Sequence, residues 1–210
     1  MFSNDGQPTE RLEALLLSHK IDVDEVAEDY VVPMSKTLSI FTEHAAQIDN
    51  EFHGASDIRL KAGATDLIVA RVLLSKTMID VFRAFSDAWK VLVSNTSVSV
   101  MRRETGISLK WIAADPANQR HQIFVEAMAV IFYGVFNWMS GASLHVLKVN
   151  VAKSRQQSTS DSLHLLGAPV FYSGDSLELI FAPEIAELEV LDVQFDIWRE
   201  IGRASCRERV

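Results

Sequence analysis

The sequence contains very little cysteine, and this scarcity removes one class of chemistry at the outset. Cys206 is the single cysteine among 210 residues, and it lies four residues from the C-terminus. It leaves no basis for a redox or thiol role. The length is nevertheless sufficient for one domain of moderate size with a substantial core, and hydrophobic residues make up 48% of the chain.

Positive charge is also scarce. The formal net charge is −8, and no basic stripe runs through the body of the chain. Contacts to nucleic-acid phosphates need a basic surface, so this portion is not expected to bind DNA by itself. The start, MFSNDGQPTE, has neither a charged beginning nor an apolar run, which argues against a signal peptide. We therefore expect a cytoplasmic protein.

No apolar segment is long enough to cross a membrane as a helix. The longest candidate covers residues 123–139, and it carries Glu126 and Asn137. A membrane-spanning helix needs roughly 20 apolar residues, so a buried core helix is the better interpretation. We expect no contact with a membrane.

Familiar catalytic and metal-binding motifs are missing as well. The sequence has no G-x-S-x-G, no phosphate-binding glycine loop and no H-E-x-x-H. His44 and His53, with Glu43 and Glu51, fit no compact ligand spacing. We therefore expect no metal, no cofactor and no enzyme activity.

The last ten residues, IGRASCRERV, differ from the rest in composition and have no periodicity. They correspond to the translation of a common sequencing adapter, so we interpret residues 201–210 as read-through and not as native sequence. On this interpretation the chain is a fragment of a protein that continues past Glu200. We further expect a disordered N-terminus over residues 1–8 and a single domain over residues 9–200.

The stretch over residues 165–191 has the densest set of structural signals. Gly167-Ala168-Pro169 and residues 173–176 are turn signals, and they flank short strands at 170–172 and 177–182. Pro183 fits the first turn of a helix. The spacing of Leu188, Leu191, Phe195 and Trp198 then predicts an exit helix over residues 187–200.

The remaining chain predicts helices first and strands later. Helical periodicity or capping signals occur near residues 9–17, 25–28, 34–48, 66–74, 77–94, 118–139 and 161–166, and strand patterns at 97–102, 107–112 and 144–151. The helix at 118–139 is apolar on nearly all sides and is expected to be buried on nearly all sides. The fold class is therefore α+β, with helices packed on a small, mostly antiparallel sheet.

Several local motifs occur in an order known from one protein family. They are LLLSHKID at 15–22, VP at 32–33, SKTM at 75–78, LLGAPVFY at 165–172 and LIFAP at 179–183. In order and spacing, these motifs resemble the N-terminal effector domain, of the arabinose-binding type, of AraC/XylS transcription regulators. The resemblance covers about residues 12–198.

This resemblance implies a bacterial regulator in which this domain senses a small molecule and mediates dimerisation. DNA would be bound by a C-terminal pair of helix-turn-helix units, which would follow Glu200 and are missing from this fragment. Because the exit helix over residues 187–200 would be the only covalent link to those units, we hypothesise that ligand binding shifts this helix and so repositions them. Nothing in the residues themselves indicates a sugar.

Five residues are candidates for contact with the small molecule. Three of them supply polar groups along the long apolar helix, one could stack on a ligand ring from the hairpin, and one could hydrogen-bond from the strand at 144–151, where it is expected to share a face with Leu147, Val149 and Val151. Each also has a simpler interpretation, either as a solvent-facing group or as a core residue. In chain order the candidates are Trp111, Glu126, Tyr133, Asn137 and His145.

Two other classes of function remain open from the sequence. A small α+β enzyme or cofactor-binding sensor would reveal itself by turnover, an absorbance band or a bound metal. An interaction module without a pocket would have a packed interior with no cavity.

Overall fold

In a computed structural model of the 210-residue chain, the structure describes residues 34–53, 59–93, 96–113, 115–153 and 162–192. The chain divides into two compact units. One comprises Met1–Thr65 together with Gln194–Val210, and the other comprises Asp66–Val193. The helices predicted near residues 9–17 and 25–28 lie outside the described residues. The domain limits expected from the sequence stay a prediction.

The first unit contains helix α2 (Met34–Ile48), which has the predicted bounds. Its end is organised by the buried Asn50, whose side-chain oxygen accepts hydrogen bonds from the backbone N–H groups of Phe52 and Leu60 at 3.1 and 3.2 Å. The neighbouring Glu51 accepts bonds from the backbone N–H and the hydroxyl of Thr65. The turn after α2 is therefore fixed by side-chain bonds to backbone donors, as is common for asparagine in turns.

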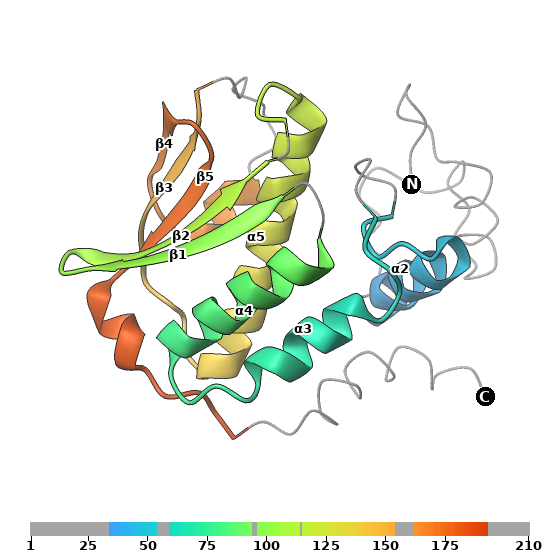
Figure 1. Ribbon diagram of the computed structural model, residues 1–210, viewed down its shortest axis with the longest axis horizontal. Helices are drawn as coiled ribbons and strands as arrows, with labels where there is room; N and C mark the ends of the chain where they lie inside the picture. The colour runs from blue at the N-terminus through green and yellow to red at the C-terminus, as the bar shows by residue number, and fades with distance from the viewer. Residues whose placement is uncertain (1–33, 54–58, 94–95, 114, 154–161, 193–210) are drawn as a thin grey trace. The chain divides into compact units, whose positions relative to one another are not determined.

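The second unit contains a five-stranded sheet and the remaining helices (Figure 1). The helices are α3 (Ala64–Val72), which begins just before the unit, α4 (Met78–Leu92), α5 (Gln119–Ser140) and two 3₁₀ helices, η1 (Ser162–Leu166) and η2 (Pro183–Glu187). The strands are β1 (Ser97–Arg103), β2 (Gly106–Ile112), β3 (Val146–Ala152), β4 (Val170–Gly174) and β5 (Leu177–Phe181). The predicted α+β class is confirmed.

The strands are arranged in the order β1-β2-β5-β3-β4. All neighbours pair in an antiparallel manner except β3 and β4, which are parallel. Strand β5 comes last of these five strands in the sequence and lies in the centre of the sheet. Pairing Trp111 with Leu177, and Leu109 with Leu179, brings the hairpin β1–β2 into register with the late strands.

Helices α4 and α5 pack against one face of the sheet (Figure 1). Along β2 and β5, every second residue is apolar and buried, as expected for a sheet covered on one side; these residues are Ile107, Leu109, Trp111, Leu177, Leu179 and Phe181. Phe82 and Phe85 from α4 meet Phe136 from α5 with ring centroids 5.1 and 5.3 Å apart. Phe82 also contacts Phe181 of β5 at 5.0 Å. Aromatic side chains therefore join both helices to the sheet.

Helix α5 is less deeply buried than its apolar sequence predicts. Ile123 and Ile131 are about half exposed, while Phe132 and Phe136 face the core. Residues 121–140 are long and apolar enough to cross a membrane by length and composition alone, but half of the most apolar window is buried within the protein, as in the core helix of a soluble fold. The prediction of burial on nearly all sides was wrong because α4, η1 and the sheet leave one side of α5 exposed, at Ile123, Ile131 and Gly134.

Strand β3 begins with an irregularity that changes which side chains are buried. The register shifts between Val146 and Lys148, so Val146, Val149 and Val151 are buried while Leu147 is exposed. Simple alternation predicts that His145 and Leu147 share a face with Val149 and Val151. That prediction was wrong because an extra residue in a strand reverses the alternation beyond it.

The segment after η2 is extended where a helix was predicted. The N–H of Met78 donates to the carbonyl of Leu188 at 2.9 Å, and the N–H of Val190 donates to the carbonyl of Lys76 at 3.0 Å. The N–H of Leu191 donates to the carbonyl of Met139 at 2.9 Å. We call residues 188–191 the strap, because they connect the start of α4 with the end of α5.

The strap corrects the predicted exit helix over residues 187–200. Within the strap, backbone groups are used for bonds to α4 and α5, so they are unavailable for helical bonds. The apolar spacing of Leu188 and Leu191 reflects contacts made by an extended segment. The rest of the predicted helix, from residue 193 onward, lies outside the described residues.

Candidate functional site

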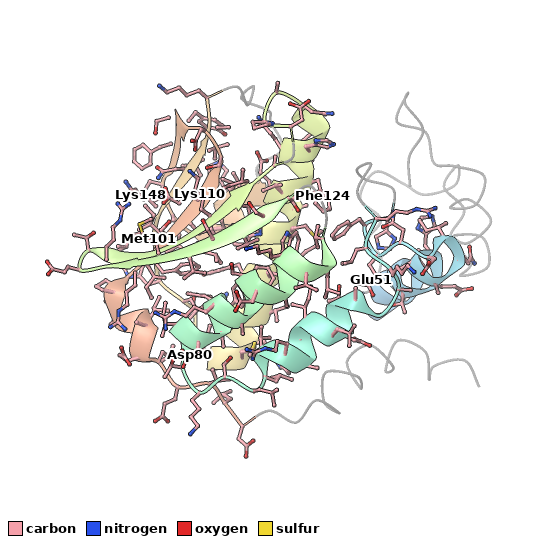
Figure 2. All side chains as sticks on the ribbon, viewed as in Figure 1. Glu51, Asp80, Met101, Lys110, Phe124 and Lys148 are labelled. Atoms are coloured by element: carbon pink, nitrogen blue, oxygen red, sulfur yellow. The ribbon has the colours of Figure 1, made fainter. Side chains whose placement is uncertain are left out.

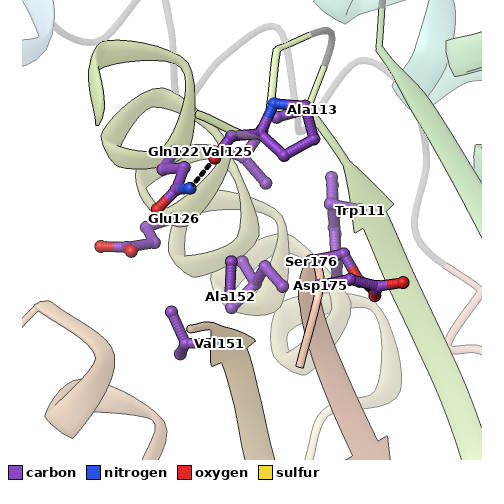
Figure 3. A pocket seen from close by; sticks show the side chains of 11 residues that line it. Trp111, Ala113, Gln122, Val125, Glu126, Val151, Ala152, Asp175 and Ser176 are labelled. Carbon is purple, nitrogen blue, oxygen red and sulfur yellow. Dashed lines mark hydrogen bonds between the residues drawn. The ribbon is translucent and has the colours of Figure 1, made fainter. Parts of the chain in front are cut away.

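A small pocket lies between the first turns of α5 and the end of β2 (Figure 3). It has a volume of about 20 Å³ and is partly open to solvent. This is room for roughly one water molecule. Figure 3 shows that α5 supplies one wall, while β2, β3 and the turn before β5 supply the others. The lining residues are Trp111, Ala113, Pro116, Gln122, Val125, Glu126, Val151, Ala152, Asp175, Ser176 and Leu177.

Trp111 is the largest side chain in the pocket wall, and its indole N–H is a donor without a partner. The residue is 1% exposed, and Nε1 makes no hydrogen bond within the described part of the chain. An unsatisfied buried donor costs about 1–3 kcal/mol. By contrast, Trp89, which is also fully buried, donates its indole N–H to the hydroxyl of Thr96 at 3.0 Å. Trp111 therefore has a donor available to a ligand or a water molecule.

The α5 wall contributes two polar side chains spaced by four residues, which places them on one side of the helix. Gln122 donates from its amide nitrogen to the carbonyl of Pro116 in the preceding turn. Glu126 is only 5% exposed. Both predicted candidates Trp111 and Glu126 thus line the same pocket.

The opposite wall is formed by the turn between β4 and β5. Asp175 accepts hydrogen bonds from the ammonium of Lys110 and from the hydroxyl of Ser176, each at 2.9 Å. The hydrogen bonds from Lys110 and Ser176, with the positive charge of Lys110, lower the pKa of Asp175. The Lys110–Asp175–Ser176 group therefore connects the pocket with the uncovered face of the sheet.

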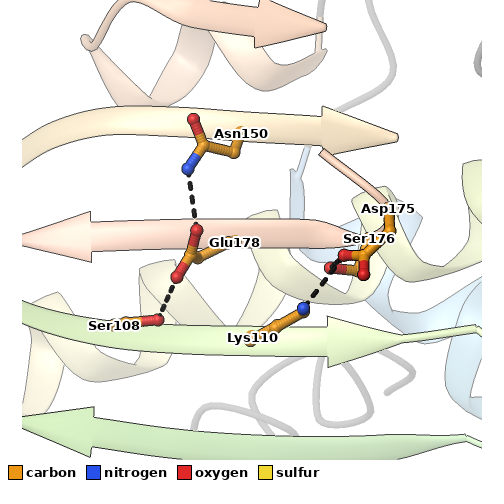
Figure 4. A network of polar contacts seen from close by, with 6 residues as sticks. All are labelled: Ser108, Lys110, Asn150, Asp175, Ser176 and Glu178. Atoms are coloured by element: carbon orange, nitrogen blue, oxygen red, sulfur yellow. Dashed lines mark hydrogen bonds and ion pairs between the residues drawn. The ribbon is translucent and has the colours of Figure 1, made fainter. Parts of the chain in front are cut away.

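A second polar group crosses that uncovered face (Figure 4). Glu178 of β5 accepts hydrogen bonds from the hydroxyl of Ser108 and, at 2.7 Å, from the amide of Asn150. Burial raises the pKa of Glu178, but these two bonds and the charges of Lys110 and Lys148 outweigh it and lower the pKa overall. Glu178 thereby joins three strands, β2, β5 and β3. Met101, Lys110 and Lys148, labelled in Figure 2, belong to the same face.

Two other predicted candidates, Tyr133 and Asn137, lie farther along α5 and hold the chain just before β3. The hydroxyl of Tyr133 donates to the carbonyl of Leu144 at 2.9 Å, and the N–H of Leu144 donates to the side-chain oxygen of Asn137 at 2.7 Å. Neither residue lines the pocket. Their polar groups are occupied by this structural contact.

His145 is exposed and precedes β3. Its backbone carbonyl accepts a hydrogen bond from the N–H of Ala182 at 3.0 Å, and it does not line the pocket. Of the five predicted candidates, the structure therefore brings together Trp111 and Glu126. Sequence reasoning missed Gln122 and Ser176, because the first turns of α5 and the turn before β5 are distant in sequence and meet only in the fold.

In the first unit, His44 and His53 face each other with their Nδ1 atoms 3.0 Å apart. Their ring centroids are 5.3 Å apart and the planes differ by 23°. Two rings whose Nδ1 atoms point directly at each other suit an N–H···N hydrogen bond. Two histidine ligands of a tetrahedral metal would instead both point at the metal, from different directions. No group of three or more potential metal ligands occurs in the part of the chain that the structure describes.

The family "Arabinose-binding domain of AraC transcription regulator, N-term" matches residues 11–190. The chain belongs to this family. Its match covers the pocket, the sheet and the strap up to residue 190, so the family resemblance seen in the sequence motifs is confirmed. No curated protein matches the sequence.

Among solved structures, the chain is similar to the transcriptional regulator CdpR from Pseudomonas aeruginosa, with a TM-score of 0.50 and 13% sequence identity. The similarity covers 92% of this chain and 59% of CdpR. The chain thus corresponds to rather more than half the length of that regulator. At this level of identity the similarity concerns the fold.

Proposed function

We propose that this chain is the effector-sensing part of an AraC-type transcription regulator, and that the pocket at Trp111 and Glu126 receives the effector. The observation that carries the proposal is the unpartnered indole N–H of Trp111 in the wall of a pocket. Membership of the family supports a regulatory role over an enzymatic one. A regulatory role also implies a cytoplasmic location. Membership of the family implies a bacterial source.

The strap offers a route by which an occupied pocket could affect the rest of a regulator. Helix α5 carries Glu126 near its start and Met139 near its end, about 20 Å apart at 1.5 Å per residue. Met139 holds Leu191 of the strap through a backbone hydrogen bond. A small displacement of α5 by a ligand would therefore reach the segment that leads to residue 193 and beyond.

A screen of small molecules against the full chain tests this function. Thermal unfolding and tryptophan fluorescence identify binders, and hydrogen exchange then reports where protection increases. We expect protection at the first turns of α5 and a change at the amides of the strap. Protection confined to the pocket would contradict the proposed route, and a binder unaffected by Trp111→Phe would contradict the proposed site. Trp89→Phe is the matched control, because Trp89 is buried outside the pocket with its N–H satisfied.

We further propose, from family membership, that the chain forms homodimers and that DNA is bound by helix-turn-helix units outside it. The 59% coverage of CdpR is in keeping with additional units in such regulators. Light scattering of the purified chain at several concentrations tests the dimer. A monomeric mass throughout would refute it.

A further inference from the structure

The two edges of the sheet differ in how they are protected. Strands β1 and β4 form these edges (Figure 1). Strand β1 packs against α4, where the hydroxyl of Ser86 donates to the carbonyl of Val98, and its end carries the charged residues Arg102 and Arg103. A covering helix and charged side chains are two of the means by which natural sheets keep an edge from pairing with other chains.

Strand β4 has neither form of protection among the described residues. Its five residues, Val170–Gly174, include no charged residue and no proline, and the strand pairs only with β3. The side chains of Phe171 and Tyr172 are 48% and 39% exposed. An uncharged edge strand with exposed aromatic side chains is suited to pairing with a further strand.

The pairing of β4 with β3 determines which of its backbone groups face outward. The carbonyl of Pro169, just before β4, accepts a hydrogen bond from the N–H of Val149 in β3 at 2.9 Å. Successive residues of a strand direct their backbone groups to opposite sides, so those of Phe171 also point toward β3. Those of Val170 and Tyr172 therefore point away from the sheet, one residue to each side of Phe171.

This arrangement is complementary to itself. If a second copy approaches in an antiparallel manner with Phe171 facing Phe171, then Val170 of each copy lies opposite Tyr172 of the other. On each side of the two-fold axis, such a pair exchanges both of its backbone hydrogen bonds. The two Phe171 side chains then occupy the closely spaced position without hydrogen bonds, where aromatic pairs stabilise a sheet.

The distribution of charge also favours a second copy at this edge. The chain has a net charge of −8, so two copies repel each other in general. Residues 165–174 contain no charged residue. Two copies can therefore meet along β4 without placing like charges opposite each other.

We propose that the chain forms a two-fold dimer by antiparallel pairing of β4 with β4 of a second copy, with Phe171 at the axis. The two sheets then become one continuous sheet. This inference rests on the homodimer proposed above and assigns its surface.

Charged residues at position 171 test this register. Phe171→Lys and Phe171→Glu each place like charges opposite each other at the axis, so each variant alone should dimerise about tenfold more weakly or not at all. An equimolar mixture of the two variants should regain the dimer, because opposite charges then face each other. Sedimentation velocity over a range of concentrations measures the dissociation constants. Loss of the dimer without recovery in the mixture would refute the pairing of Phe171 with itself.

Met101→Lys is the matched control. Met101 is 51% exposed and lies on β1, at the opposite edge of the sheet. This variant introduces the same charge and should dimerise like the unmodified chain. Equal weakening by Met101→Lys and Phe171→Lys would indicate a general effect of charge and would overturn the assignment to β4.

Hydrogen exchange in the unmodified chain makes the test independent of how any variant folds. The N–H groups of Val170 and Tyr172 should exchange more slowly as the concentration of the chain is raised, because only the dimer supplies their acceptors. The N–H of Phe171, which points toward β3, should be protected at every concentration. NMR measures these rates residue by residue. Exchange at Val170 and Tyr172 that stays fast in a dimeric sample would overturn the proposal.

The remaining outcomes separate the surface from the function. A dimer that persists in both Phe171 variants would refute β4 as its surface and leave the homodimer intact. A monomeric mass of the unmodified chain at all concentrations would refute both the homodimer and its surface, while the effector pocket is tested separately by ligand binding. Masses that grow beyond that of a dimer would indicate head-to-tail pairing and would refute the two-fold arrangement.

Discussion

Gly106 occupies a position that no other residue can take without moving the sheet. Its φ of +150° lies in the region that favours glycine, and an added Cβ would be 2.5 Å from the carbonyl oxygen of Phe181. We predict that Gly106→Ala lowers the free energy of unfolding by about 2 kcal/mol or more, through backbone strain and the displaced pairing of β2 with β5. Urea unfolding followed by circular dichroism measures this loss.

Gly134 serves as the control for that substitution. It lies in α5, has no atom within 4 Å of an added Cβ, and has no positive φ. Gly134→Ala should therefore raise stability by about 0.5–1 kcal/mol, as for alanine in place of glycine within a helix. Equal effects at the two positions would contradict the assigned role of Gly106.

His53 is expected to make stability depend on pH. Burial, followed by the charge of His44, lowers the pKa of His53 from 6.5 to about 4. The folded state thus favours neutral His53, so its stabilising effect is complete above pH 6.5 and is lost as pH falls from 6.5 toward 4. Urea unfolding at pH 7.5 and at pH values between 6.5 and 4 should show this decline.

His53→Asn isolates this effect. His53 has a φ of +54°, and asparagine tolerates such a backbone better than most residues. The variant should show a smaller decline in stability between pH 6.5 and 4. An unchanged decline would place the responsible group elsewhere in the chain.

At the scale of elements, the strap depends on Gly141 at the end of α5. Its φ is +64°, and an added Cβ would be 2.7 Å from Cδ1 of Leu191. Gly141→Ala should therefore displace Leu191 and speed hydrogen exchange at its N–H, which is bonded to the carbonyl of Met139. Exchange followed by NMR, residue by residue, measures the effect.

Gly167 provides a close match, because its φ is +65° and nothing lies within 4 Å of an added Cβ. Gly167→Ala should cost about 1–2 kcal/mol from backbone strain alone and should leave the strap in place. If both variants speed exchange at Leu191 equally, the contact between Gly141 and Leu191 does not hold the strap.

The sequence predicted the elements of the second unit well, because their periodicity is local. The helix predicted at 118–139 is observed as Gln119–Ser140, and the hairpin is observed at β1 and β2. The prediction from apolar periodicity failed at the strap. Leu188 and Leu191 have helical spacing there, but their backbone groups form long-range hydrogen bonds to α4 and α5. Local pattern contains no information about such distant partners.

The same limit applies to the candidate site. Trp111 and Glu126 were recognised as individual residues, but their common pocket depends on the packing of α5 against the sheet. Tyr133 and Asn137 have the same polar character on the same helix, and both are bonded to Leu144. The facing pair His44 and His53 depends on a turn with two left-handed residues, which the sequence does not reveal.

For the whole molecule, the charge balance gives a further prediction. The net charge is −8 and the sequence isoelectric point is about 5.2. Affinity for DNA without sequence preference requires neutralisation of phosphates by cationic side chains. We predict that the chain does not bind a random-sequence DNA duplex at low or at physiological salt. Fluorescence anisotropy of a labelled duplex measures this, and salt-dependent binding would contradict it.

The central position of β5 in the sheet has a consequence for synthesis of the protein. Strand β5 separates the hairpin β1–β2 from the pair β3–β4, and among the described strands it is the one that is synthesised last. A ribosome must therefore release residues 177–181 before the two halves of the sheet can join. Until then, both flanks of the missing strand present open edges, which invite pairing with other chains. Exposure of the nascent chain to pairing through these edges is thus greatest just before residues 177–181 emerge.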